Sequence, residues 1–524
     1  MQRLHMLASW IKREYSKFEE RPFDFPYPSC VAAAIVLLAL VFSVIFLFFD
    51  YEVDSDVAKS YAYLLRAFQH REWEHFFNPN LPLLTPFLAA LLRECFPILE
   101  PFQALVLLSG IYFSASVAVL YQLLYQNLNK HGLALLAALL FCCAPQTIRF
   151  AGNGWLEIGR NFYVILTIFL FDKQMRDFSV ARSFILGVSL FALSLSRGEG
   201  IFFAIILLTV GSIALKRNGQ LTGRRFAAGG MGPLVITFLF PVVFYSLMMY
   251  RITGFLVPDK RIAAIVNRWF SGNLQISPGQ DLTVDYFTMS FGDAVNDFFS
   301  GGEYCYVIMA LGGILLLICR KWRWIHTACL MISTVNFIGC LNTVTQSRYF
   351  TLNTPVLMIF TVTAAGFSYH LALSYLPKYQ KTVKAAVMIG LAAMLMGMVD
   401  KGLSYLRRGD RRSREIGHFL HCNREKIWGK KLPFIYSSAF AYTTHVDCRI
   451  LNRYLVQLPD LGKTDLLDGA VLPVGKKIKR EALRQEMEKI RQRKDWERVP
   501  SPYDDSIAVY RRKRNCGIPH LEDQ

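Results

Sequence analysis

The chain has 524 residues, carries a net charge of +19 and is 53% apolar, whereas only 19% of its residues are charged. This composition excludes a disordered chain, a collagen and an ordinary soluble enzyme, and it indicates an integral membrane protein. The basic excess does not indicate nucleic-acid binding, because no recognition motif for DNA or RNA is present. The eleven cysteines form no disulfide framework, since most lie inside apolar runs.

The first apolar run that is long enough to cross a bilayer extends from Ser29 to Phe49. Five basic residues and no cleavage site precede it, so we interpret it as an uncleaved signal anchor with residues 1–28 in the cytoplasm. Ten further runs follow, at about 101–126, 132–148, 157–171, 183–196, 201–215, 227–249, 303–319, 324–341, 352–372 and 385–400. The sequence therefore predicts an α-helical polytopic membrane protein with about eleven transmembrane helices in residues 29–400.

The apolar stretch 82–97 is left out of this count because of the charges in later loops. If it crossed the membrane, the basic loops that follow residues 171 and 215 would lie outside, against the positive-inside rule. We therefore predict a juxtamembrane or re-entrant helix here, within a first outer loop that covers residues 50–100.

An odd number of spans places residues 401–524 on the outer side of the membrane. Six basic residues directly after the last span oppose this orientation, but the rule is weaker for late segments that precede a folded domain. Helix-like and strand-like stretches alternate in this region, so we predict a small extracytoplasmic α/β domain. One side of an amphipathic helix in the first outer loop would carry Tyr61, Leu64, Leu65 and Phe68, as in a helix that lies in the membrane interface.

Charged residues gather at the outer ends of the predicted spans, where ionisable side chains indicate function. Asp54 and Asp56 belong to an acidic cluster that suits a cation or a general base, although it could equally be a solvated loop. Glu157 opens a span, where the helix dipole alone would favour it. Arg197 and Glu199 could form a local ion pair. Arg348 suits a phosphate, or it could extend to the interface.

Taken in chain order, the predicted spans and loop motifs of residues 29–372 resemble the glycosyltransferase C superfamily. The resemblance is strongest to the bacterial branch related to protein O-mannosyltransferases and the lipid A aminoarabinose transferase. The similar motifs are the acidic first loop, PLLTPFLAALL at 82–92, Cys143-Ala144-Pro145 followed by Glu157, LSLSRGEG at 193–200, and Arg348-Tyr349-Phe350 followed by Pro355. Two departures concern the site: Asp54-Ser55-Asp56 replaces the usual Asp-Glu pair, and Gly198 replaces a proline.

The resemblance implies transfer of a sugar from a polyprenyl-phosphate-linked donor to a glycan, lipid or protein acceptor on the outer face of the bacterial inner membrane. It implies Asp54 as catalytic base, with Asp56 as the alternative. Arg348 would bind the donor phosphate with support from Arg197, and Glu157 and Glu199 would bind a divalent metal ion or the acceptor. A metal ion is the one cofactor that it allows.

Two other functions stay open at this point. A transporter or flippase of lipid-linked sugars would have inverted repeats and spans interrupted by glycine or proline in corresponding halves, and we identify neither. A catalytically inactive scaffold would not need the carboxylates of the first loop, which are present.

Overall fold

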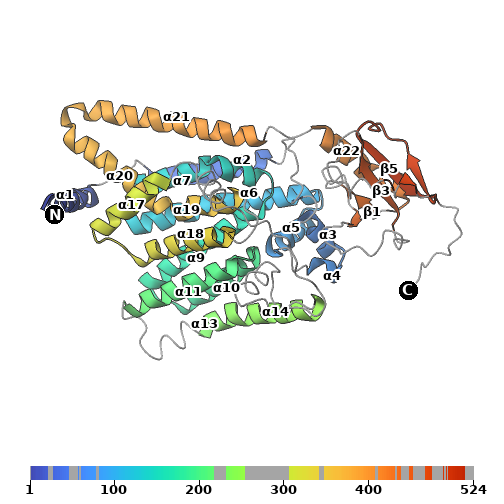
Figure 1. Ribbon diagram of the computed structural model, residues 1–524, viewed down its shortest axis with the longest axis horizontal. Helices are drawn as coiled ribbons and strands as arrows, with labels where there is room; N and C mark the ends of the chain where they lie inside the picture. The colour runs from blue at the N-terminus through green and yellow to red at the C-terminus, as the bar shows by residue number, and fades with distance from the viewer. Residues whose placement is uncertain are drawn as a thin grey trace. The chain divides into compact units, whose positions relative to one another are not determined.

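The computed structural model describes residues 2–21, 27–46, 57, 61–77, 82–217, 232–253, 306–341, 347–406, 411–430, 433–437, 446, 448–451, 467–474, 488, 491–492 and 494–513. The chain divides into two compact units (Figure 1). The first, which we call the helical unit, comprises Met1–Phe48, Pro79–Thr85 and Val106–Leu406. The second, the C-terminal unit, comprises Phe49–Asn78, Pro86–Leu105 and Arg407–Gln524, so most of the first loop groups with the C-terminal region.

Each of the eleven predicted apolar runs contains a helix, because long apolar segments in lipid must satisfy their backbone groups internally. The helices and helical turns of this part are α1 (Gln2–Glu20), α2 (Pro28–Phe46), α6 (Pro101–Leu128), α7 (His131–Cys143), α8 (Pro145–Gly152), α9 (Leu156–Arg176), α10 (Val180–Ser196), α11 (Gly200–Arg217), α13 (Gly232–Leu234), η3 (Val235–Leu239), α14 (Phe240–Thr253), α17 (Tyr306–Ile318), α18 (Trp324–Leu341), η4 (Ser347–Leu352), α19 (Asn353–Val356), α20 (Met358–Tyr375), η5 (Pro377–Tyr379) and α21 (Gln380–Leu406).

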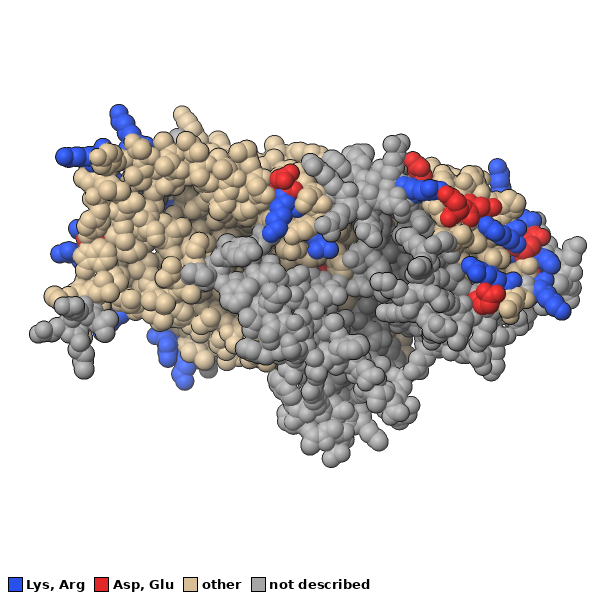
Figure 2. Space-filling view, turned by 45° about the horizontal axis from the view of Figure 1, so that its top comes forward, with Lys and Arg blue, Asp and Glu red and all other residues tan. Residues whose placement is uncertain are grey.

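By length and composition, five helices among the described residues are able to cross a membrane, or up to seven if each bent pair counts as one span. The helix α9 does not meet these criteria because charged residues interrupt both of its ends. On the face that Figure 2 shows, most of the described surface of the helical unit is uncharged, as a lipid-facing surface has to be. The chain is a multi-pass membrane protein, and the number of eleven spans stays a prediction.

Two of the predicted spans are broken, one of them at Pro145, so the statement that no span is interrupted by glycine or proline is wrong. The pair α7 and α8 bends by 55° and the pair α19 and α20 by 49°. Pro145 stands at the first position of α8, where its missing N–H leaves no hydrogen bond unmade. One turn before the second break, the hydroxyl of Ser333 donates to the amide oxygen of Asn353 at 2.9 Å.

The N-terminal helix α1 is fixed to the helical unit by its C-terminal end. Lys130 is buried in the turn between α6 and α7, and its Nζ donates to the carbonyl oxygens of Glu19 and Arg21, at 3.1 and 2.5 Å. The positive charge of Lys130 also interacts favourably with the negative, C-terminal end of the α1 helix dipole. Phe18 packs edge-on against Phe367 of α20, so a predicted cytoplasmic segment is an integral part of this unit.

In the first loop, α3 (Ala62–Gln69), α4 (Trp73–Phe76) and α5 (Leu84–Cys95) are short helices. The twelve residues of α5 span about 18 Å, less than the roughly 30 Å of a bilayer core. The predicted one-sided interfacial helix is wrong for α3, because Tyr63 and Arg66 are buried as well as Leu64 and Leu65. Within the C-terminal unit α3 contacts β2, and protein therefore covers more than one of its faces.

The predicted α/β fold of the C-terminal region is confirmed. A five-stranded sheet has the order β2-β1-β3-β5-β4, in which β1 is parallel to β2 and β3, while β5 is antiparallel to β3 and β4. Its core includes Ile416, Leu420 and Ile435. The strands and their helices are β1 (Phe434–Ser437), β2 (Arg449–Leu451), β3 (Gly469–Pro473), β4 (Trp496–Val499), β5 (Ile507–Arg512), α22 (Arg411–Cys422) and α23 (Arg424–Trp428).

Candidate active site

Two tight turns position the charged residues of the helical unit. Gly154, with a φ of 70°, forms the turn that starts α9, so Glu157 stands in the first turn of that helix. Between α10 and α11 the backbone N–H of Gly200 donates to the carbonyl of Arg197 at 2.9 Å. A Cβ at position 200 would lie 1.9 Å from the carbonyl oxygen of Leu193, so only glycine fits here. These turns bring Arg197 and Glu199 beside the first turns of α9.

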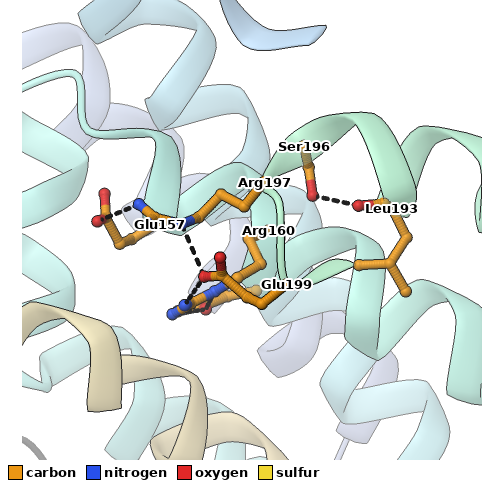
Figure 3. A network of polar contacts seen from close by, with 7 residues as sticks. Glu157, Arg160, Leu193, Ser196, Arg197 and Glu199 are labelled. Atoms are coloured by element: carbon orange, nitrogen blue, oxygen red, sulfur yellow. Dashed lines mark hydrogen bonds and ion pairs between the residues drawn. The ribbon is translucent and has the colours of Figure 1, made fainter. Parts of the chain in front are cut away.

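The charged side chains from these two places form one chain of ion pairs, which we call the Glu–Arg network (Figure 3). Arg197 donates from Nη1 to Glu157 Oε1 at 2.6 Å and from Nε to Glu199 Oε1 at 2.7 Å. The same oxygen of Glu199 accepts a hydrogen bond from Nη1 of Arg160 at 2.8 Å. Two arginines and two glutamates thus alternate, and their formal charges cancel.

Three members of the Glu–Arg network are almost completely enclosed. Glu157 and Arg160 have no exposed surface and Arg197 is 5% exposed, whereas 29% of the Glu199 side chain is accessible. Desolvation raises the pKa of the Glu199 carboxyl, but the charges of Arg197 and Arg160 outweigh this and lower it to about 2. Glu199 is therefore the accessible member of the network, and it is negatively charged at neutral pH.

The structure brings three of the predicted site residues together. The local pair of Arg197 with Glu199 exists, and it continues to Glu157 forty residues earlier in the chain. The sequence analysis missed Arg160 and its neighbour Asn161, although an arginine in the second turn of an apolar helix is the kind of ionisable group at membrane depth that indicates function.

The other predicted site residues are not seen beside this network. Arg348 belongs to η4, whose backbone contacts α9, but its side chain lies outside the described residues. Asp54 and Asp56 also lie outside them. Their roles stay predictions.

A divalent metal ion does not fit the two glutamates of the network. Arg197 stands between Glu157 and Glu199 and pairs with both, so its positive charge would repel a cation there. Within the described part of the chain, no group of three or more His, Cys, Asp or Glu side chains could hold a metal ion. The predicted contact of these carboxylates with the acceptor stays a prediction.

No protein-family model matches the sequence, and no curated protein does. Solved structures are similar in fold. ArnT from Cupriavidus metallidurans bound to undecaprenyl phosphate is 13% identical with a TM-score of 0.59, over 93% of this chain and 99% of that one. Its apo form is 12% identical with a TM-score of 0.56, over 91% and 97%. The chain therefore has the fold of ArnT, in agreement with the resemblance.

Proposed function

We propose that this chain, whose fold is that of ArnT, is a membrane glycosyltransferase. It would move a sugar from a polyprenyl-phosphate-linked donor to an acceptor of the cell envelope, on the outer face of the bacterial inner membrane. The observation that carries this proposal is the buried Glu–Arg network, which lies inside a fold that holds undecaprenyl phosphate in ArnT. An enclosed network of charges is costly in a membrane protein, which supports a functional role.

The reaction needs one base and one group that stabilises the departing phosphate. The acceptor hydroxyl oxygen forms a bond to the anomeric carbon while the bond from this carbon to the phosphate oxygen breaks. The hydroxyl proton passes to the carboxylate of Asp54, or to Asp56 as the alternative. The polyprenyl phosphate leaves with the electron pair of the broken bond.

Arg348 would bind the donor phosphate, because a guanidinium stays charged and matches phosphate oxygens in pairs. A phosphate would have to compete with two carboxylates for Arg197. We therefore assign Arg197 a supporting role. The contact of η4 with α9 supports this arrangement, since the helical turn that includes position 348 packs against the helix that carries Glu157.

Glu199 would contact a hydroxyl or a cationic group of the acceptor, because it is the accessible member of the network. With a pKa of about 2 it stays ionised at neutral pH and cannot deliver a proton. Glu157 would act through Arg197, which it holds in place at 2.6 Å.

The test is transfer of label from radioactive polyprenyl-phosphate sugars, in membranes that contain the wild type, the Asp54→Asn plus Asp56→Asn double variant, or Glu52→Gln. Glu52→Gln is the matched control, because it neutralises another carboxylate of the same acidic loop. We expect the double variant to lose transfer by roughly a hundredfold or more, and Glu52→Gln to keep it. Full activity of the double variant would remove the base assignment.

A second outcome would overturn the function itself. If donors with several different sugars and endogenous acceptors give no transfer above membranes that lack the protein, the chain is a transporter or a scaffold. Inhibition by a chelator would show that a metal ion takes part.

A further inference from the structure

Asn161 extends the Glu–Arg network by one uncharged side chain. It stands in the second turn of α9, directly after Arg160, and none of its surface is exposed. Its amide oxygen accepts two hydrogen bonds from the Arg160 guanidinium, from Nε at 3.3 Å and from Nη2 at 3.2 Å.

This contact fixes which way the Asn161 amide faces. An arginine has only donors, so the oxygen of the amide must be the atom that faces it. Arg160 in turn is held by Glu199, and Glu199 by Arg197. The amide nitrogen, Nδ2, therefore has to point away from the guanidinium, and the ion pairs hold it there.

The two N–H groups on Nδ2 find no acceptor among the described residues, although the atom is fully buried. Gln174, near the other end of α9, shows the usual situation for a buried amide. Its Nε2 donates to the Ser183 hydroxyl at 2.7 Å, and its Oε1 accepts from the backbone N–H of Ser179. Buried donors without an acceptor are costly and rare, so the Asn161 nitrogen requires a partner outside the described residues, and a bound substrate can supply it.

We infer that Asn161 is a substrate-binding residue whose Nδ2 donates a hydrogen bond to an oxygen of the bound substrate. The inference rests on the proposed function. The chemistry limits the class of ligand atom, because an amide nitrogen only donates. It binds a phosphate, hydroxyl, ring or carbonyl oxygen, and it does not bind an ammonium group. The network serves to orient this donor, and Arg160 is a positioning residue.

The test compares Asn161→Asp with Gln174→Glu in the purified, full-length protein. Asn161→Asp keeps an oxygen toward Arg160 and replaces the NH₂ by a second oxygen, which repels a substrate oxygen. Gln174→Glu makes the same chemical change in the same helix, where both ends of the amide already have protein partners. We expect Asn161→Asp to lower kcat/KM for transfer by roughly ten- to a hundredfold, while Gln174→Glu keeps wild-type kcat/KM.

The rise in Tm caused by undecaprenyl phosphate shows whether the oxygen that Asn161 contacts belongs to the donor or to the acceptor. A smaller stabilisation of Asn161→Asp by this lipid assigns the contact to the donor phosphate. Wild-type stabilisation with a raised KM for the acceptor assigns it to the acceptor. If Asn161→Asp does not fold, Asn161→Ala removes the donor without adding charge and is expected to show the same loss.

Folded Asn161→Asp with wild-type kcat/KM and KM for both substrates overturns the inference and leaves the proposed function intact. In that case a trapped water satisfies Nδ2. A wild type that neither transfers sugar nor binds undecaprenyl phosphate overturns the proposed function, and the substrate role of Asn161 with it.

Discussion

Glu157 and Arg197 are both buried, and neither is isolated in the low-dielectric interior because each holds the other. Such a pair adds little net stability by its attraction, but removing one partner is strongly destabilising because the other charge stays buried without compensation. This distinction can be measured with variants that remove one or both charges.

We expect Glu157→Gln to destabilise the protein by on the order of 3 kcal/mol, because it leaves the buried Arg197 with one carboxylate fewer. Glu157→Gln combined with Arg197→Gln should cost less than the sum of the two single changes, because Glu199 and Arg160 remain as a balanced pair. The measurement is a double-mutant cycle of unfolding in detergent. Strict additivity would contradict a direct coupling of the two charges.

The low pKa of the Glu199 carboxyl predicts how the stability of the protein depends on pH. Its pKa in the folded protein is about 2 and its ordinary value is 4.5, so the ionised form contributes stability above pH 4.5. This contribution is lost as the pH falls from about 4.5 toward about 2. The difference in Tm between the wild type and Glu199→Gln should therefore shrink over this range. A difference that stays constant down to pH 3 would contradict the low pKa.

Among the helices, α17 and α20 approach each other closely where α17 carries two adjacent glycines. A Cβ at position 312 would lie 2.0 Å from the backbone carbonyl oxygen of Phe360, and the backbone cannot move aside as a flexible side chain can. At position 313 the nearest atom would be 3.9 Å away, which is ordinary contact. Small residues at such crossings let membrane helices pack without a hydrophobic driving force.

We expect Gly312→Ala to destabilise the protein by about 1–3 kcal/mol through overpacking. Gly313→Ala is the matched control, and it should be neutral or slightly stabilising because alanine favours helix. Thermal unfolding of both variants in detergent tests this. Equal effects of the two substitutions would mean that α17 and α20 do not cross at Gly312.

Over the whole molecule, the predicted odd number of spans would place the two termini on opposite sides of the membrane. Cys422 at the end of α22 is exposed and offers a native reporter for the predicted outer side. Ser16 on the exposed side of α1 offers a matched position on the predicted inner side.

We expect a membrane-impermeant maleimide to label Cys422 in intact spheroplasts, and Cys422→Ser to lose this part of the label. A cysteine introduced by Ser16→Cys should react only after permeabilisation, because the predicted topology leaves α1 in the cytoplasm. Labelling of both positions in intact spheroplasts would indicate an even number of spans.

The sequence by itself determined where the helices form, that the C-terminal region is α/β, and which charged residues stand at the ends of the helices. These properties are local, because hydropathy and periodicity are sums over neighbouring residues. Glu157, Arg197 and Glu199 could therefore be proposed individually from their positions at helix ends.

Only the tertiary structure decided which of these charges meet. Packing of α9 against the turn between α10 and α11 joins Glu157 to Arg197, and it adds Arg160 and Asn161, which no motif indicated. It also decided the bends at α8 and α20 and the burial of α3 on more than one face. The physical reason is that a hydrogen bond depends on two positions in space, and forty residues of chain separate Glu157 from its partner.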